Sequence, residues 1–153
     1  MNWLYNNKEI NSLEDFGEKI PFGFIYEVQY IETGKKYIGK KVLFFTKTKK
    51  LGKKELVILK EQRKNTPGRV PTTIQVVSES DWKSYYGSHE ELKKLVKSEG
   101  ENKFTRQILL LVYNKKHLTY YENKYLFTHS VLESNDYFNN NIENRYFRKD
   151  FTE

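Results

Sequence analysis

The chain has 153 residues, enough for one domain with a buried core and no covalent staples. It contains no cysteine, which excludes disulfides, thiolate zinc sites and cysteine nucleophiles. The 27 Lys and Arg against 20 Asp and Glu give a net charge of +7, and a basic surface favours polyanions. No apolar run approaches the ~20 residues of a membrane-spanning helix, and the N-terminus lacks a signal-peptide pattern. We therefore expect a soluble, cytoplasmic protein without a membrane partner.

Residues 22–45 carry the clearest structural pattern, after a polar lead-in over residues 1–20 that is expected to pack on the core. Apolar and polar side chains alternate before and after a turn at residues 32–35, which is typical of a β-hairpin. With a two-residue turn, Tyr26 would lie opposite Lys41 and share one face with Tyr37 and Lys41. A loop one residue longer would put the two tyrosines on opposite faces unless a bulge restored the phase.

The elements after the hairpin alternate between helix and strand. A lysine-rich insertion comes first, with a helix and a strand inside it. A helix with a capping box at Ser88 and Glu91 follows, then a third strand, the longest helix and a polar aromatic tail. The expected ranges are 44–78 for the insertion, 55–64 and 72–77 within it, then 88–99, 104–113, 117–132 and 134–153. This order predicts a single α+β domain over 1–153, with a small three-stranded, mostly antiparallel sheet flanked by helices.

The shared hairpin face suits a phosphate group. Gly39 lies between Tyr37 and Lys41 and leaves room for a ligand or for an approaching backbone. A lysine offers a point charge to a phosphate oxygen, and Tyr26 could orient or deprotonate water if a nearby cation lowered its pKa. Ordinary cross-strand packing of the tyrosines is the competing interpretation, and spacing alone favours it.

A resemblance to a known family changes that balance. Phe24-Ile25-Tyr26, then ten residues, then Tyr37-Ile38-Gly39 resembles the GIY-YIG signature of the nuclease superfamily of that name, with Phe in place of the first Gly. Later motifs follow the superfamily's order and look especially like its phage-encoded, homing-endonuclease-like branch: Asp81–Ser88, Gly100, Phe104–Arg106, Glu122 and Tyr137–Asn139. The resemblance covers most of residues 22–145. It implies a metal-dependent endonuclease that hydrolyses DNA phosphodiester bonds, in the host cytoplasm if phage-encoded.

The resemblance also implies a metal ligand and a catalytic amide. The family holds one divalent ion on a glutamate of the helix after the third strand, and Glu122 occupies that place. Glu122 borders the apolar stripe of the helix expected over 117–132, where a carboxylate is costly unless it is paired or ligating. Alternatively, Thr119 and Glu122 fit a capping box at the start of a helix. One carboxylate with waters suits Mg²⁺, or Mn²⁺. The family's asparagine near the C-terminus corresponds to Asn139, in a stretch crowded with other asparagines.

The cation of the site departs from the family pattern. The superfamily usually has an arginine about ten residues beyond the second tyrosine, and this chain has Lys47 there. Lys41 is the first substitute from the hairpin register, and Arg63 is the second if the insertion helix brings it back. Arg106, on the third strand, is expected to pair with a carboxylate instead.

Residues 35–54 contain nine lysines and no acidic residue. Such a run is commonly a solvated face, but beside the hairpin we expect it to contact the DNA backbone without reading sequence. The candidate contact residues are Lys40, Lys47, Lys49, Lys50, Lys53 and Lys54. Packing is favoured over base stacking for Trp82, Tyr85 and Tyr86, and His89 could assist the site.

Two other functions stay open. The chain could be a non-catalytic nucleic-acid-binding protein, supported by the missing first glycine and displaced arginine, or an RNA-processing nuclease. A single active site cuts one strand, so double-strand cleavage would require a homodimer on DNA or two encounters.

Overall fold

The computed structural model describes residues 2–152, which form two compact units. We call the first the sheet unit; it contains the residues up to Leu43 and those from Asp81 onward. The second, Phe44–Ser80, we call the arm. The arm corresponds to the predicted insertion over 44–78 and is two residues longer at its C-terminal end. Residues 1 and 153, the ends of the predicted lead-in and tail, lie outside the description. No helix within the described residues is long and apolar enough to cross a membrane.

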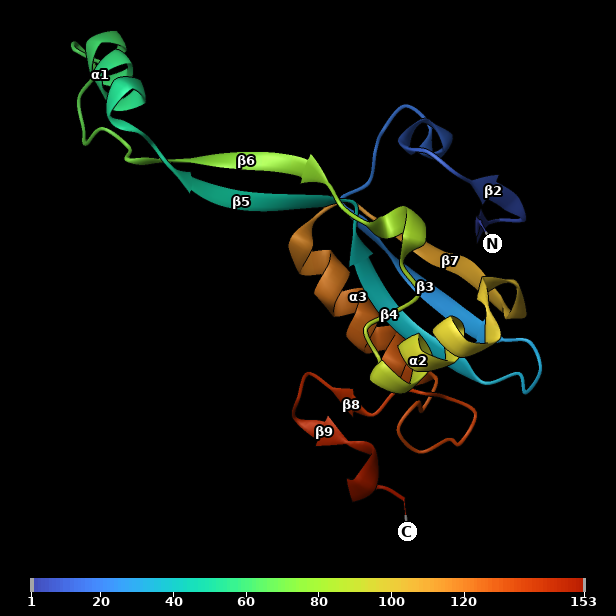
Figure 1. The fold of residues 1–153 in the computed structure, drawn as a ribbon. Coiled ribbons are helices and arrows are strands. Elements are labelled where there is room, and N and C mark those ends of the chain that lie inside the picture. The colour runs from blue at the N-terminus through green and yellow to red at the C-terminus, as the bar shows by residue number, and fades with distance from the viewer. Residues whose placement is uncertain (1, 153) are drawn as a thin grey trace. The chain divides into compact units, whose positions relative to one another are not determined.

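The sheet unit is built on a mixed sheet of five strands in the order β2-β1-β7-β3-β4 (Figure 1). The strands are β1 Trp3–Tyr5, β2 Lys8–Ile10, β3 Gly23–Tyr30, β4 Lys36–Val42 and β7 Phe104–Val112. All pairs are antiparallel except β1 with β7. The predicted α+β class and the three antiparallel strands β4, β3 and β7 are confirmed. The strand number is larger because the lead-in, anchored by buried Trp3 and Ile10, adds a hairpin to the edge of β7.

The β3–β4 hairpin has a longer loop than predicted. Tyr30 N donates to Lys35 O at 2.9 Å, so four residues form the loop, and Gly34 adopts a φ of 75° that favours glycine. Tyr26 therefore lies opposite Gly39 rather than Lys41. The predicted pairing is wrong by two residues, and an even shift preserves the alternation of faces.

Aromatic side chains cover one face of the sheet. The ring centroids of Trp3 and Phe24 are 5.0 Å apart, and Trp82 lies 6.4 Å from Phe24. Trp82 is fully buried and Tyr86 is 7% exposed, so the packing role favoured from the sequence is confirmed for both. Helix α2, Glu90–Glu99, follows this aromatic segment. It is capped by the side chain of His89, not by Ser88, because the Ser88 hydroxyl is hydrogen-bonded to Tyr37.

Helix α3, Lys115–Thr128, packs on the opposite face (Figure 1). Its buried Leu118 and Leu126 join a core cluster with Ile25 and Ile38. The side chain of Asn114 caps the helix by accepting from His117 N at 2.8 Å. The predicted helix 117–132 therefore begins two residues earlier and ends four residues earlier than expected. The proposed capping box of Thr119 and Glu122 is wrong, because both residues lie inside the helix.

The C-terminal tail covers the outer edge of β4. Backbone hydrogen bonds join Lys36 N to Asp136 O at 2.8 Å and Phe138 N to Lys36 O at 2.7 Å. The tail continues through two short strands, β8 Asn141–Ile142 and β9 Tyr146–Phe147. The Arg148 guanidinium then holds it together by donating to the carbonyls of Val131, Ser134, Tyr137 and Asn139.

The arm is a two-stranded ribbon whose strands are joined by a helix (Figure 1). Its elements are β5 Phe44–Lys50, α1 Lys53–Gln62 and β6 Thr73–Glu79. The helix predicted over 55–64 begins and ends two residues earlier, and the strand predicted over 72–77 begins one residue later and ends two residues later. The sequence did not predict the ribbon, because β5 was not identified as a separate strand. Helix α1 buries none of its residues.

Candidate active site

A cavity of about 700 Å³ opens in the sheet unit. Four segments line it: β4, the first turn of α2 with the residues just before it, the middle of α3 and the tail. The lining residues that carry polar groups are Tyr37, Lys40, Ser88, His89, Glu90, Glu91, Glu122, Asn139, Asn140, Asn141, Glu143 and Asn144. Because β4 is the edge strand, the cavity reaches side chains from both faces of the sheet.

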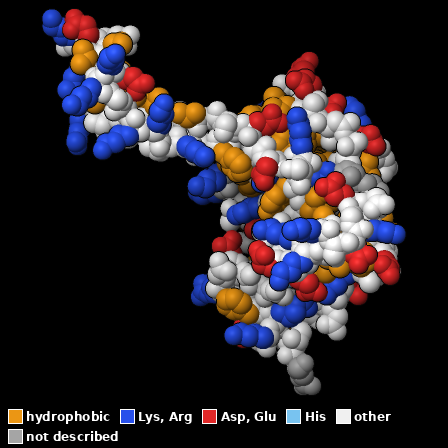
Figure 2. Space-filling model, viewed as in Figure 1, with side chains coloured by type: hydrophobic (Ala, Val, Ile, Leu, Met, Phe, Trp, Pro, Cys, Tyr) orange, Lys and Arg blue, Asp and Glu red, His pale blue; other side chains and the backbone are white. Residues whose placement is uncertain are grey.

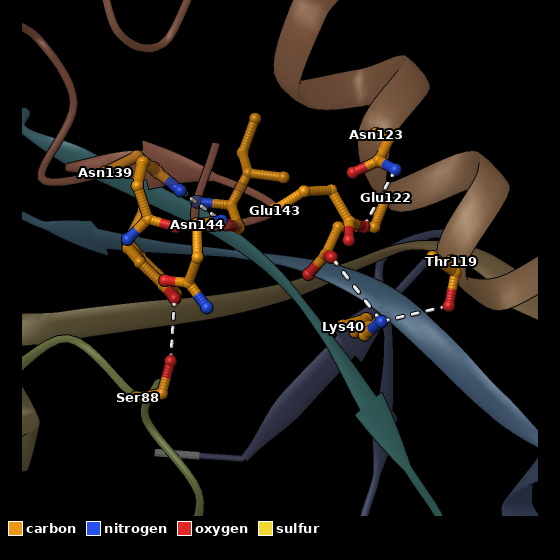
Figure 3. A network of polar contacts seen from close by, with 11 residues as sticks. Lys40, Ser88, Thr119, Glu122, Asn123, Asn139, Glu143 and Asn144 are labelled. Atoms are coloured by element: carbon orange, nitrogen blue, oxygen red, sulfur yellow. Dashed lines mark hydrogen bonds and ion pairs between the residues drawn. The ribbon is translucent and has the colours of Figure 1, made fainter. Parts of the chain in front are cut away.

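Glu122 is the carboxylate that α3 brings to this cavity. Burial raises its pKa above the ordinary value of 4.5, and the nearby Glu143 carboxylate raises it further, while Lys40 opposes both effects. The Lys40 ammonium lies 3.7 Å from Glu122 and donates to the Thr119 hydroxyl at 3.0 Å (Figure 3). The site thus pairs a partly desolvated carboxylate with a single fixed cation.

Lys40 occupies a different place from the one expected of a backbone-contact lysine. Successive side chains of a strand point to opposite faces, so Lys40 faces α3 while Lys41 shares the face of the tyrosines. Lys41 is 8% exposed, contacts Asp81 Oδ1 at 2.5 Å and lies 3.8 Å above the Tyr85 ring. Lys41, the preferred substitute for the family arginine, is therefore engaged outside the cavity lining, whereas the preceding residue, Lys40, is part of that lining.

Tyr26 fills the space that Gly39 leaves. A Cβ on Gly39 would lie 2.6 Å from the Tyr26 hydroxyl, so the gap accommodates this phenol rather than a ligand. Tyr26 is 1% exposed, and burial raises its pKa well above 10.0. Tyr26 therefore does not have the lowered pKa that a tyrosine needs to act as a base. The ring supports Tyr37, whose centroid is 6.2 Å away.

Tyr37 is the phenol that lines the cavity. Its hydroxyl is 3.0 Å from the Ser88 hydroxyl, and burial raises its pKa above 10.0. The charge of Glu122 contributes to the raised pKa of both Tyr37 and Tyr26. The two phenols and the carboxylate therefore lie within electrostatic range of one another, although the strand and the helix present them from opposite faces.

Asn139 is held by backbone atoms. Its side chain accepts from Ile38 N at 3.1 Å and donates to Ile38 O at 2.8 Å. This double hydrogen bond fixes the strand residue next to Tyr37, which supports a positioning role. Asn140 extends the same wall, where its amide is 2.7 Å from Nε2 of His89.

Glu143 is a cavity residue that sequence reasoning missed. It occupies a turn with a φ of 56°, and Asn123 donates to its carboxylate at 2.9 Å (Figure 3). The crowding of asparagines around it, residues that tolerate left-handed backbone, was the one available signal of a tight turn.

Other predicted site residues are not among those that line the cavity. Arg63 is the C-cap residue that follows α1 in the arm. The candidate contact residues Lys47, Lys49, Lys50, Lys53 and Lys54 also belong to the arm, and all five are exposed. Arg106 is buried, where it donates to the carbonyls of Lys83 and Tyr85 at 2.9 Å each. Burial lowers the pKa of Arg106 below its ordinary value, while the Tyr86 phenol and the Glu101 carboxylate raise it by less.

The donor set of the cavity fits a hydrated hard cation. Among residues 2–152 no three His, Cys, Asp or Glu side chains are grouped as they are in a zinc site. Glu122 on α3, with Glu143 lining the same cavity from the tail, supplies the one or two carboxylates through which Mg²⁺ usually binds while keeping most of its water.

Comparison with known proteins agrees with the sequence motifs. The family described as putative endonuclease segE, GIY-YIG domain, matches residues 3–142, which include all of the cavity residues except Glu143 and Asn144. No curated protein and no solved structure gives a significant match. The match spans both units of the fold and the greater part of the chain. The chain therefore belongs to the segE-type GIY-YIG endonuclease family.

Proposed function

We propose that the chain is a metal-dependent endonuclease that hydrolyses DNA phosphodiester bonds in the cavity at the edge of β4. The observation that supports this most directly is that Tyr37, Lys40 and Glu122 line one cavity, although they come from opposite faces of the sheet. A phenol, an ammonium and a carboxylate around a space of about 700 Å³ suit a phosphate group and its surrounding water.

Tyr37 contacts the scissile phosphate or the attacking water. Its raised pKa keeps the phenol protonated at neutral pH, so it donates a hydrogen bond and orients its partner. Tyr26 acts behind it by fixing the ring position through packing, since its own hydroxyl is buried. This arrangement gives Tyr37 the water-orienting role that the sequence suggested for Tyr26.

Lys40 supplies the positive charge that the family arginine usually provides. It lies 3.7 Å from Glu122, and its hydrogen bond to Thr119 holds the ammonium in place. A fixed cation stabilises negative charge as it grows on the phosphate in the transition state. Lys41 and Asp81 support the tyrosine face from outside the cavity.

Glu122 would hold a Mg²⁺ or Mn²⁺ ion, which supplies charge neutralisation at the phosphate oxygens when bound. Asn139 keeps the β4 backbone in register beside Tyr37 through its two hydrogen bonds to Ile38. A single set of these groups cleaves one strand, so nicked circles should precede linear DNA.

Cleavage of supercoiled plasmid in Mg²⁺ tests the proposal. Glu122→Gln should lower kcat/KM on the order of 1,000-fold, the loss seen when a charge-organising group is removed. Glu18→Gln, at an exposed position remote in sequence from the cavity residues, is the matched control and should keep full activity. Equal cleavage by Glu122→Gln would refute the assignment, and faster cutting of a structured RNA would replace DNA as the substrate.

A further inference from the structure

Almost all of the net positive charge of the chain lies in the arm. Phe44–Ser80 contains nine Lys and Arg against three Glu, which gives it +6 of the total net charge of +7. The sheet unit retains 18 basic and 17 acidic residues and is nearly neutral. Figure 2 shows basic side chains along the ribbon and over α1, whereas both signs are interspersed on the visible face of the sheet unit. The arm is therefore the part of the molecule that attracts a polyanion most strongly.

The two faces of the ribbon differ in chemistry. Lys47 pairs with Val76 and Lys49 pairs with Ile74, and paired residues point to the same face. This face, which we call the lysine face, also carries Phe45 and bears two positive charges and no acid. The opposite face has Thr46, Thr48, Gln75 and the exposed Val77 at its centre, and its net charge is zero because it carries Lys50 at one end and Glu79 at the other.

The arm leaves apolar side chains uncovered. Val57 and Ile58 on α1 are 67% and 58% exposed, and Val76 on the lysine face is 42% exposed. A ten-residue helix in which no residue is fully buried is only marginally stable in water. A bound partner would cover these groups, and two arms that each carry +6 repel one another, which disfavours a second copy as that partner.

We infer that the arm binds duplex DNA, with the lysine face along the major groove and Lys47 and Lys49 reaching the phosphates that border it. The major groove of B-DNA admits a two-stranded ribbon, whereas that of A-form RNA is too deep and narrow. The inference rests on the proposed function for its substrate and adds where the duplex is held. Contacts of this kind position the duplex and are strongly salt-dependent.

Binding of a short fluorescent DNA duplex to the full-length protein, followed by anisotropy in EDTA, tests the inference. Lys47→Gln/Lys49→Gln should weaken affinity about tenfold or more and reduce the slope of log K against log salt by about 1.8, since each phosphate contact adds about 0.9. The duplex should also protect the arm from trypsin, because its basic residues become covered.

Two controls separate charge position from charge number. Lys94→Gln/Lys97→Gln removes two exposed lysines from α2, and Thr46→Ala/Thr48→Ala alters the opposite face of the same ribbon. Both should leave affinity and salt slope unchanged. An equal loss in the α2 double variant, no loss in the lysine-face variant, equal affinity for duplex RNA, or a change of oligomeric state in the lysine-face variant would overturn the inference. Because no divalent ion is present, these outcomes are independent of whether the cavity cleaves DNA.

Discussion

The sheet unit and the arm differ in how much of each is buried and in net charge. The sheet unit buries apolar side chains on both faces of its sheet, so its cavity groups are held in fixed positions. The arm has a helix with no buried residue and a net charge of +6. A reaction site needs groups placed before the substrate arrives, whereas contact with a charged backbone can gain its order from the partner. The sheet unit therefore contains the buried core, and the arm carries most of the net positive charge.

The largest expected effect concerns packing. Leu118→Ala, in the core under α3, should lower the free energy of unfolding by about 3 kcal/mol, because it removes a buried side chain and leaves a cavity. Ile58→Ala, on exposed α1, should change it by less than about 0.5 kcal/mol. Urea unfolding measures both. A comparable loss for Ile58→Ala would show that the arm is packed in solution, and the contrast between the units would fail.

The second prediction separates the two tyrosines. Tyr37→Phe should reduce plasmid cleavage about 100-fold, the loss expected for one hydrogen bond made in the transition state, because Tyr37 lines the cavity and its hydroxyl contacts Ser88, another lining residue. Tyr26→Phe keeps the buried ring and should cost less than about tenfold. Duplex affinity in EDTA should be the same for both variants, since the arm is untouched. A larger loss for Tyr26→Phe would restore that residue as the group that acts on water.

The smallest effect is a pH dependence of stability. Burial raises the pKa of Glu122 above 4.5, so the native state binds a proton more tightly than the unfolded state does. The free energy of unfolding should therefore fall as pH rises from about 4.5 through the raised pKa. Glu122→Gln cannot ionise and should remove this decline, whereas Glu18→Gln should preserve it. Thermal melts in EDTA across this range measure the difference, and identical profiles for all three proteins would contradict it.

Local patterns predicted most of the sheet that carries the site. The alternation around Tyr26 and Tyr37 specified the hairpin, and the shared face survived because the true loop is longer by an even number of residues. The stripe around Glu122 specified a helix with this carboxylate at its border. These predictions succeeded because strand and helix periodicity are properties of neighbouring residues.

The remaining features depend on contacts between distant segments. The parallel pairing of β1 with β7 joins residues about 100 positions apart, and no local pattern specifies it. Lys40 was predicted to contact the DNA backbone, because the sequence does not show that α3 packs against the face of β4 that carries Lys40. Glu143 reaches the cavity only because the tail folds back along the strand edge.

Arg148 ties the far end of the tail to the segment that lines the cavity. One guanidinium gathers four carbonyls, and the segment it organises pairs with the free edge of β4 through Asp136 and Phe138. Severing the chain just before this residue would bare an unpaired strand, which is a template for association with other chains. Truncation before Arg148 should therefore make the protein aggregate and should also disorder the part of the cavity that the tail lines.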